Sequence, residues 1–354
     1  MEDRNVVLSV KDLYVKFRVR GRELTAIRGI SLDIYEHESV AIVGESGSGK
    51  SVFTKTFAGM LERNGYIAGG SIEFEGQDLT KIQGAKGWSK IRGSKIATVF
   101  QDPMTSLNPI LTIGKQITSV ILRHQNCSEG EARGRALSMM KKVGIPNAEA
   151  RFDDYPFQYS GGMRQRIVIA IALSCQPKIL ICDEPTTALD VTIQAQILRL
   201  IKDLQKEFGY SIVFITHDLG VVANIADRVA VLYAGQIVEL GTAEEVFYDP
   251  CHPYTWALLS SLPQLARKNA KLYSITGTPP SLYSEVTGDA FAPRNPYALK
   301  IDSLKAPPLF QVTPTHFART WLLDSRAPKV EKPEIIQNLH EKMLNASGGQ
   351  NVES

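Results

Sequence analysis

The sequence predicts an α/β fold of two lobes into which a block of helices is inserted. Two observations support this prediction. Over about the first 260 residues, short apolar segments typical of buried strands alternate with segments of helical spacing. The alternation is interrupted from about Thr105 to Cys175, where the pattern is helical. Strand–helix alternation around such a block is the outline of a two-lobed α/β domain.

The N-terminal part of the chain reads as short strands, because apolar residues alternate or cluster between turn signals. The predicted strands are Val6–Val10, Tyr14–Arg20, Ser31–Ile34, Val40–Val43, Ser71–Phe74 and Ile96–Phe100. A helix is predicted over Ser51–Leu61, where apolar residues have helical spacing and the Asn64-Gly65 turn follows.

The middle of the chain contains the predicted helical block. Ser128 and Glu131 have the spacing of a capping box, so a helix is expected to open there and to end at Gly144. Ser160 precedes a second strong helix, which Pro177 closes. The elements predicted after it are the strands Ile179–Cys182 and Ser211–Thr216, a helix from about Gln194 to Phe208 between them, and a hairpin of Val229–Tyr233 with Gln236–Glu239.

Composition and charge exclude several classes of protein. The chain has 354 residues, of which 44% are apolar and 22% charged, as in a folded globular protein. Its 40 basic and 37 acidic side chains leave a net charge of +3, which indicates no basic face for nucleic acid. No apolar run approaches the roughly 20 residues that span a bilayer, and no secretory signal is visible. Free thiols are expected at Cys127, Cys175, Cys182 and Cys251.

A glycine-rich loop follows the strand Val40–Val43 and matches the pattern GxxxxGK[ST]. Its glycines let successive backbone N–H groups converge on phosphate oxygens, and the N-terminus of the next helix adds partial positive charge. Lys50 is placed to reach the β- and γ-phosphates, and the Ser51 hydroxyl to bind Mg²⁺. The residues expected to bind the nucleotide here are Gly44, Glu45, Ser46, Gly47, Ser48, Gly49, Lys50 and Ser51.

Two carboxylates end the buried strand that begins at Ile179. In a phosphate-loop protein the first acid, Asp183, supports Mg²⁺, and the second, Glu184, is placed to activate a water molecule. Alone, an apolar run that ends in two acids is more often a solvated strand end. The phosphate loop upstream and the segment that follows favour the catalytic interpretation.

Further motifs resemble those of the ATP-binding-cassette (ABC) family. Tyr159-Ser160-Gly161-Gly162-Met163-Arg164-Gln165 resembles the family's signature motif and lies shortly before Asp183. The other matching positions are Gln101 for the Q-loop, Ala188-Leu189-Asp190 for the D-loop, His217 for the switch histidine and Phe17 for the aromatic residue that stacks on adenine.

This resemblance implies a fold and a reaction. The fold is that of the P-loop NTPases, a RecA-like lobe with an antiparallel β subdomain and an inserted helical subdomain. The reaction is hydrolysis of ATP with Mg²⁺, and Ser51, Gln101 and Asp183 are expected to face the metal ion. The expected catalytic residues are Glu184 as general base, His217 at the γ-phosphate, Gln101 and Lys50.

The resemblance also implies that each site is completed by a second subunit. Ser160, Gly161 and Gly162 of this chain would bind the γ-phosphate of the ATP that the partner holds. Asp190 would link the two sites. Two ATP molecules are then sandwiched in a head-to-tail dimer, and closing on ATP followed by opening after hydrolysis is the work stroke.

Longer segments resemble the ATP-binding subunits of oligopeptide and dipeptide importers, including the Ami-type oligopeptide permeases. The resemblance covers about residues 6–325 and includes the segments Phe100–Pro109, Ser160–Arg166, Pro185–Gln194, His252–Thr255 and Gly277–Pro280. It implies an ATP-binding cassette over residues 1–262, with a helical subdomain at about 103–176. A peptide-transporter extension over 263–330 and a C-terminal helix or flexible tail over 331–354 would follow.

The extension departs from the family pattern at four positions. Many relatives carry cysteines there that suit an iron–sulfur cluster. In this chain the corresponding residues are Asp289, Asn295, Asp302 and Thr320. Because iron–sulfur clusters need thiolate ligands, we predict no cluster and expect packing alone to hold the extension. A hard-metal site built on Asp289 and Asp302 is the minor alternative.

The resemblance implies partners and a location. The implied partners are a second homologous ABC ATPase subunit, two transmembrane permease subunits and, indirectly, an extracellular substrate-binding lipoprotein. Nucleic acid is not an expected partner. The chain would be peripheral, on the cytoplasmic face of the cell membrane. A heterodimer of cassettes is expected, and a homodimer stays open.

Three alternatives remain at this point. Nickel importers share much of this cassette and are the alternative for the cargo. A soluble cassette ATPase that acts on ribosomes or DNA is a different class, and the single cassette without a coiled-coil insertion argues against it. A regulatory, non-hydrolysing half of an asymmetric dimer is the third, and the intact Lys50, Glu184 and His217 argue against it.

Overall fold

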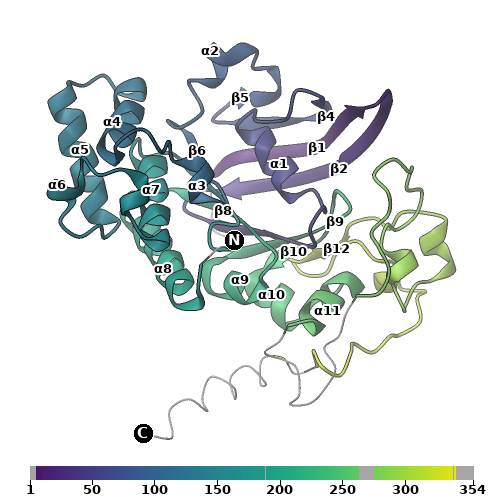
Figure 1. Ribbon diagram of the computed structural model, residues 1–354. Helices are drawn as coiled ribbons and strands as arrows, with labels where there is room; N and C mark the ends of the chain where they lie inside the picture. Colours follow the sequence, from purple (N-terminus) through teal and green to yellow (C-terminus); the bar gives the residue numbers. More distant parts are fainter. Residues whose placement is uncertain (1–4, 188, 263–274, 338, 340–354) are drawn as a thin grey trace, which may run out of the picture.

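A computed structural model describes residues 5–187, 189–262, 275–337 and 339, which form two β-sheets with helices packed around them (Figure 1). The smaller sheet is antiparallel, with the strand order β2-β1-β4-β5. Its strands are β1 (Val6–Val19), β2 (Arg22–Tyr35), β4 (Gly65–Phe74) and β5 (Gln77–Asp78). The larger sheet has the order β11-β12-β10-β9-β3-β8-β7-β6.

The strands of the larger sheet differ in direction. Five of them run parallel to one another: β3 (Ser39–Val43), β6 (Ile96–Val99), β7 (Ile179–Asp183), β8 (Ser211–Thr216) and β9 (Arg228–Tyr233). The other three pair in antiparallel fashion beyond β9, and they are β10 (Gln236–Thr242), β11 (Phe310–Gln311) and β12 (Phe317–Ala318). Because parallel strands end at one edge, the segments after β3, β6, β7 and β8 meet there.

Helices and the smaller sheet cover both faces of the larger sheet. All five residues of β3 are buried, as expected for a strand that is covered on both sides. Ile42 packs in an apolar cluster with the smaller sheet, and Val43 packs in another with α9 to α11. The helices outside the helical block are α1 (Lys50–Phe57), α2 (Gly84–Trp88), α8 (Val191–Phe208), α9 (Leu219–Ile225), α10 (Ala243–Tyr248) and α11 (Pro253–Ser260).

The helical block lies between β6 and β7 in the chain and to one side of the larger sheet (Figure 1). Its helices are α3 (Pro103–Ser106), α4 (Ile113–His124), α5 (Glu129–Lys142), α6 (Ala148–Arg151) and α7 (Gly161–Leu173). Ile117, Met140 and Ile169 share one buried cluster with Leu180 of β7 and Phe214 of β8. The block is therefore packed against the sheet through a continuous apolar core. Among the described residues no helix is long and apolar enough to cross a membrane.

The α/β fold and the capping box at Ser128 are confirmed, and several boundaries differ from the prediction. The predicted strands Val6–Val10 and Tyr14–Arg20 form one strand, because a bulge at Asp12, with φ +45°, keeps the pairing intact across the break in alternation. The helix predicted to reach Leu61 ends at Phe57, before Gly59 with φ +57°. The predicted tail beyond Gln337 lies outside the described residues, except for Leu339.

The C-terminal extension is packed into the same fold. Its strand β12 pairs with β10 through Glu239 opposite Ala318. The Glu239 carboxylate is fully buried and accepts hydrogen bonds from the backbone N–H groups of Cys251 (2.6 Å) and His252 (3.0 Å). His316 Nε2 lies 2.8 Å from it. Buried carboxylates are tolerated where several donors satisfy them, so these contacts fasten the extension to the hairpin β9–β10.

The four residues at which the resemblance leads us to expect cysteine instead cap local turns. Asp289 accepts a hydrogen bond from the N–H of Phe291 at 3.0 Å, and Asp302 accepts one from the N–H of Leu299 at 2.6 Å. In the same way, Asn295 Oδ1 accepts a hydrogen bond from the N–H of Tyr297 at 2.9 Å, and the Thr320 hydroxyl accepts one from the N–H of Leu322 at 3.3 Å. Short polar side chains commonly stabilise turns in this way.

Candidate active site

The phosphate loop connects β3 to α1 in a conformation that depends on glycine. Gly44 has φ +151°, and a Cβ atom there would lie 2.1 Å from the carbonyl oxygen of Leu232. Gly49, with φ +105°, precedes α1, and a Cβ atom there would lie 2.9 Å from Ile27 Cδ1. Only glycine fits both positions without moving the backbone. The loop therefore turns tightly over the end of β3 and presents the N-terminus of α1.

Lys50 is held inside this loop. Its ammonium group donates to the carbonyl oxygens of Gly44 at 2.8 Å and Glu45 at 2.9 Å. Burial lowers the pKa of Lys50, although the carboxylates of Glu184 and Asp183 act in the opposite direction. A buried ammonium with two carbonyl partners and nearby carboxylates is a fixed positive charge, and phosphate oxygens would complete its coordination.

Ser51 and Asp183 form a second pair beside the lysine. The Ser51 hydroxyl donates to Asp183 Oδ1 at 3.0 Å, which joins the first turn of α1 to the end of β7. Burial raises the pKa of Asp183 above its ordinary value, and the Ser51 hydrogen bond acts in the opposite direction. A hydroxyl and a carboxylate oxygen are hard ligands of the kind that Mg²⁺ prefers. The residues present therefore fit ATP with Mg²⁺.

Glu184 is surrounded by side chains from the neighbouring strand ends. It adopts φ +48°, so the chain turns sharply after β7, and its N–H donates to the carbonyl oxygen of Ile215 at 3.0 Å. Its carboxylate accepts from Gln101 Nε2 at 3.2 Å and from the Thr187 hydroxyl at 3.1 Å, and His217 Nδ1 lies 3.2 Å away. Three segments thus orient one carboxylate, which is the arrangement needed to aim a general base.

An open cleft of about 640 Å³ runs between the phosphate loop and Glu184. Its walls come from three parts of the chain, the phosphate loop, the loops after β6, β7 and β8, and the extension. The lining residues are Glu45, Ser46, Gln101, Glu184, Thr187, His217, Ile275, Gly277, Pro279 and Arg294.

The remaining predicted site residues lie outside this cleft. Ser160 and Gly161 are exposed at the N-terminus of α7, where the Ser160 hydroxyl accepts from the N–H of Met163 at 3.4 Å. Gly162, next in the chain, packs against Ile193. Phe17 is half-buried on β1 opposite Gly65, where a Cβ atom would lie 2.6 Å from its ring. Their assigned roles stay predictions.

The D-loop residue Asp190 also lies apart from the cleft. It is exposed and caps α8, where its Oδ1 accepts from the N–H of Ile193 at 2.9 Å. Ala188 of the same predicted motif lies outside the described residues. The link between two sites that was predicted for Asp190 stays a prediction.

Three residues at the site were not identified from the sequence. Thr187 stands within a motif already quoted, but nothing in its spacing indicated a contact with Glu184. Arg294 forms an ion pair with Glu45 of the phosphate loop, and the Tyr254 hydroxyl accepts from the N–H of Glu45 at 2.8 Å. Both come from segments about 200 or more residues away from Glu45 along the chain, so no local pattern could reveal them.

Comparisons with known proteins identify the family. Residues 27–187 match the family described as ABC transporter, and residues 238–301 match the family described as oligopeptide/dipeptide transporter, C-terminal region. The chain is 64% identical to the oligopeptide transport ATP-binding protein AmiE of Streptococcus pneumoniae, over 98% of each chain. It is 54% identical to the oligopeptide transport ATP-binding protein OppD of Bacillus subtilis, over 96% of this chain and 95% of that protein.

Solved structures agree with this result. The dimeric post-hydrolysis structure of the ATP-binding cassette MJ0796 bound to ADP and Pi matches with a TM-score of 0.60 and 28% identity. The match covers 67% of this chain and 98% of that one. The chain therefore belongs to the ATP-binding proteins of the ABC transporter family, in the group that carries the oligopeptide/dipeptide transporter C-terminal region.

Proposed function

We propose that this chain is the ATP-hydrolysing subunit that powers an importer of oligopeptides. The observation that carries the proposal is the position of Glu184. Its carboxylate is oriented by Gln101, Thr187 and His217 at 3.1–3.2 Å and lines the same cleft as the phosphate loop. The relatives named as oligopeptide transport proteins, and the matching C-terminal region, supply the class of cargo.

The chain's own residues account for the hydrolytic step. The phosphate loop and Lys50 hold the triphosphate, while Glu184 takes a proton from the water that attacks the γ-phosphorus. A bond from that water oxygen to phosphorus forms as the bond to the β,γ-bridging oxygen breaks. His217 stabilises the charge that develops on the γ-phosphate oxygens. Mg²⁺, when bound by Ser51 and Asp183 with Gln101 nearby, would neutralise phosphate charge.

A second cassette completes each site in this proposal. The exposed Ser160 and Gly161, with the half-buried Gly162, form a helix N-terminus outside the cleft of their own chain, and such a terminus favours an anion. The similar cassette MJ0796 is dimeric. We expect the partner to be a second, homologous ATPase chain, and a homodimer is the alternative.

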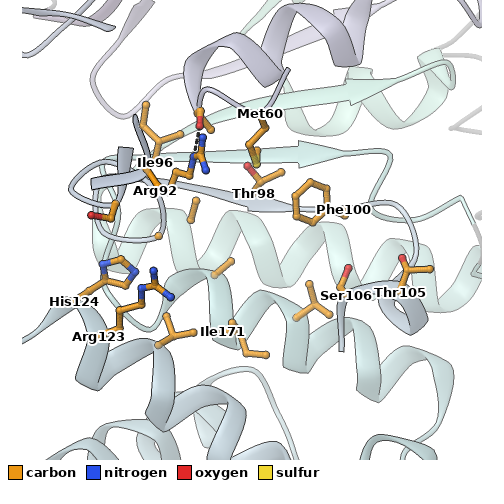
Figure 2. A pocket seen from close by; sticks show the side chains of 18 residues that line it. Met60, Arg92, Ile96, Thr98, Phe100, Thr105, Ser106, Arg123, His124 and Ile171 are labelled. Carbon is orange, nitrogen blue, oxygen red and sulfur yellow. Dashed lines mark hydrogen bonds between the residues drawn. The ribbon is translucent and has the colours of Figure 1, made fainter. Parts of the chain in front are cut away.

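The transmembrane partners dock between the sheet and the helical block. A cavity of about 810 Å³ lies there, and Figure 2 shows Met60, Phe100 and Ile171 around it. Phe100 is 41% exposed and directly precedes Gln101, so a segment seated in the cavity would act on the side chain that contacts Glu184. Since the relatives are named as transport proteins, we propose that the occupant is a cytoplasmic segment of a permease subunit. In this proposal the chain lies on the cytoplasmic face of the membrane.

The test is Glu184→Gln in the assembled transporter. The amide cannot take a proton, so ATP should still bind while hydrolysis falls by about 100-fold or more. Peptide uptake by cells that lack the wild-type gene should be lost with it. Glu207→Gln, an exposed glutamate on α8, serves as the control.

Either of two results would contradict the proposal. One is normal peptide uptake with the Glu184→Gln subunit, and the other is ATP-dependent uptake of nickel in place of peptide by the wild type. Identification of the proteins that purify with the chain from detergent-solubilised membranes would show whether the second cassette is the same chain. Iron and sulfide analysis of the same unoxidised sample tests the prediction that no iron–sulfur cluster is bound.

A further inference from the structure

We propose that the C-terminal extension is a working part of the nucleotide site, and that Arg294 is a positioning residue that holds and neutralises Glu45 of the phosphate loop. The inference rests on the proposed function, since it concerns how the same site binds ATP. It goes further because it gives the extension a task in nucleotide binding that is separate from packing.

The contact between Arg294 and Glu45 is bidentate and partly buried. Arg294 Nη1 donates to Glu45 Oε2 at 2.6 Å, and Nη2 donates to Oε1 at 3.0 Å. The Arg294 side chain is only 4% exposed. Its other N–H groups donate to the carbonyl oxygens of Thr276 and Ile275 and to the Tyr233 hydroxyl. A guanidinium whose N–H groups all donate hydrogen bonds is held in one orientation, and it orients the carboxylate to which it is paired.

Glu45 connects this ion pair to the catalytic lysine. Its carbonyl oxygen accepts from Lys50 Nζ at 2.9 Å, and its N–H donates to the Tyr254 hydroxyl at 2.8 Å. Its side-chain carboxylate accepts the two hydrogen bonds from Arg294. Backbone and side chain of one loop residue are therefore held from two sides, and the Tyr254 and Lys50 contacts hold the backbone independently of the side chain.

Charge explains why the pairing matters for ATP. Glu45 places a carboxylate in a loop whose task is to bind a triphosphate, and like charges at short range weaken binding. The Arg294 guanidinium neutralises the charge of the Glu45 carboxylate by direct contact. Residues Ile275, Gly277 and Pro279, which are also in the extension, form a wall of the same cleft. The extension thus supplies both a counter-charge and a boundary to the site.

The extension has other anchors, so loss of the ion pair need not release it. Phe291 packs edge-on against Tyr254, with ring centroids 5.3 Å apart, and His316 lies 2.8 Å from the buried Glu239 carboxylate. Neither contact involves Arg294. A variant of Arg294 is therefore expected to stay folded while the site changes.

The experiment measures ATP hydrolysis by the assembled transporter as a function of MgATP concentration. Arg294→Ala should raise KM about tenfold and leave kcat within about twofold, because the unpaired carboxylate opposes binding and Glu184 is untouched. Arg294→Ala combined with Glu45→Gln should restore KM to within about threefold of the wild type, since no unpaired charge remains. Arg326→Ala, which removes an exposed arginine–aspartate pair in the same extension, is the matched control.

The outcomes separate the possibilities. An unchanged KM in Arg294→Ala overturns the inference, and so does a raised KM that Glu45→Gln does not correct. If Arg294→Ala does not fold, Arg294→Lys takes its place, with an expected rise in KM of about threefold that Glu45→Gln again removes. Absence of hydrolysis in the wild type would contradict the proposed function itself. The failures of the two proposals are therefore distinguishable.

Discussion

Asp289 is a carboxylate held in a turn inside the extension, and its environment opposes its charge. Burial raises the pKa of Asp289 to about 6; the N–H of Phe291 acts against this shift, and the nearby Asp302 adds to it. A carboxyl group with a raised pKa binds its proton more tightly in the folded than in the unfolded chain. The ionised Asp289 therefore lowers the free energy of unfolding at neutral pH, and the protonated Asp289 does not lower it in acid.

Asp289→Asn should remove this loss of stability, because the amide has no charge to bury. Below about pH 3 both states of the wild type hold the proton, so the variant should match the wild type. As pH rises from about 4 through about 6 the wild type should lose stability relative to the variant, by about 3 kcal/mol at pH 7.5. Urea unfolding at pH 3.0, 5.5 and 7.5 checks this. A constant difference between the two proteins across that range would contradict it.

At the scale of single elements, two helices begin with the same capping box in different surroundings. In α5, Ser128 and Glu131 exchange hydrogen bonds at the exposed start of the helix. In α10, Glu245 pairs with Thr242 in the same way. It also accepts from Thr313 at 2.5 Å and Thr315 at 2.7 Å, both in the extension. The second box therefore joins a helix to the extension as well as capping it.

Glu245→Gln should lower the free energy of unfolding by about 1 kcal/mol. Glu131→Gln changes the exposed capping box of α5 and is the matched control, for which we expect a smaller loss. Burial alone would raise the pKa of Glu245, but hydrogen bonds from Thr313, Thr242 and Thr315 lower it to about 2. This stabilisation is complete above about pH 4.5 and is lost as pH falls toward 2. Denaturant midpoints at pH 6 and pH 3 measure it. Equal losses for the two variants at pH 6 would refute the role of the extension.

How far the sequence predicts these elements depends on how local their causes are. The capping box at Ser128 and the phosphate loop were predictable because a few adjacent residues determine them. The strand β1 was predicted in two pieces, since the bulge at Asp12 interrupts alternation without interrupting pairing. The two-residue strands β11 and β12 carry no periodic signal of their own. The pair Arg294–Glu45 depends on tertiary packing, which spacing along the chain does not report.

At the scale of the whole molecule, we propose that the chain contributes two separate halves of a site to the dimer. One half is the cleft between the phosphate loop and Glu184, and the other is the exposed N-terminus of α7 at Ser160. Because each half would face a different nucleotide in the proposed dimer, a change at Ser160 should act on the ATP bound by the partner. A variant can be chosen that alters charge at this position and little else.

Ser160→Asp should reduce hydrolysis by the assembled transporter at least about tenfold more than Ser160→Asn does. Both residues cap a helix well, so α7 should form in each variant, but only the carboxylate repels the partner's γ-phosphate. Steady-state hydrolysis at saturating MgATP measures the difference, and thermal unfolding of each variant verifies the cap. Equal rates for the two variants would show that Ser160 faces no phosphate in the active dimer.

The strands that the extension adds to the larger sheet also affect how the molecule behaves at high concentration. A long, unpaired β10 would offer a row of free backbone groups to any other chain, which is a common start of aggregation. Here β12 covers part of β10, and the outermost strand, β11, has only two residues, with Pro307 and Pro308 before it and Pro314 after it. Such an edge is too short to template further pairing. The extension thereby leaves no long free strand on the β10 side of this sheet in the described part of the chain.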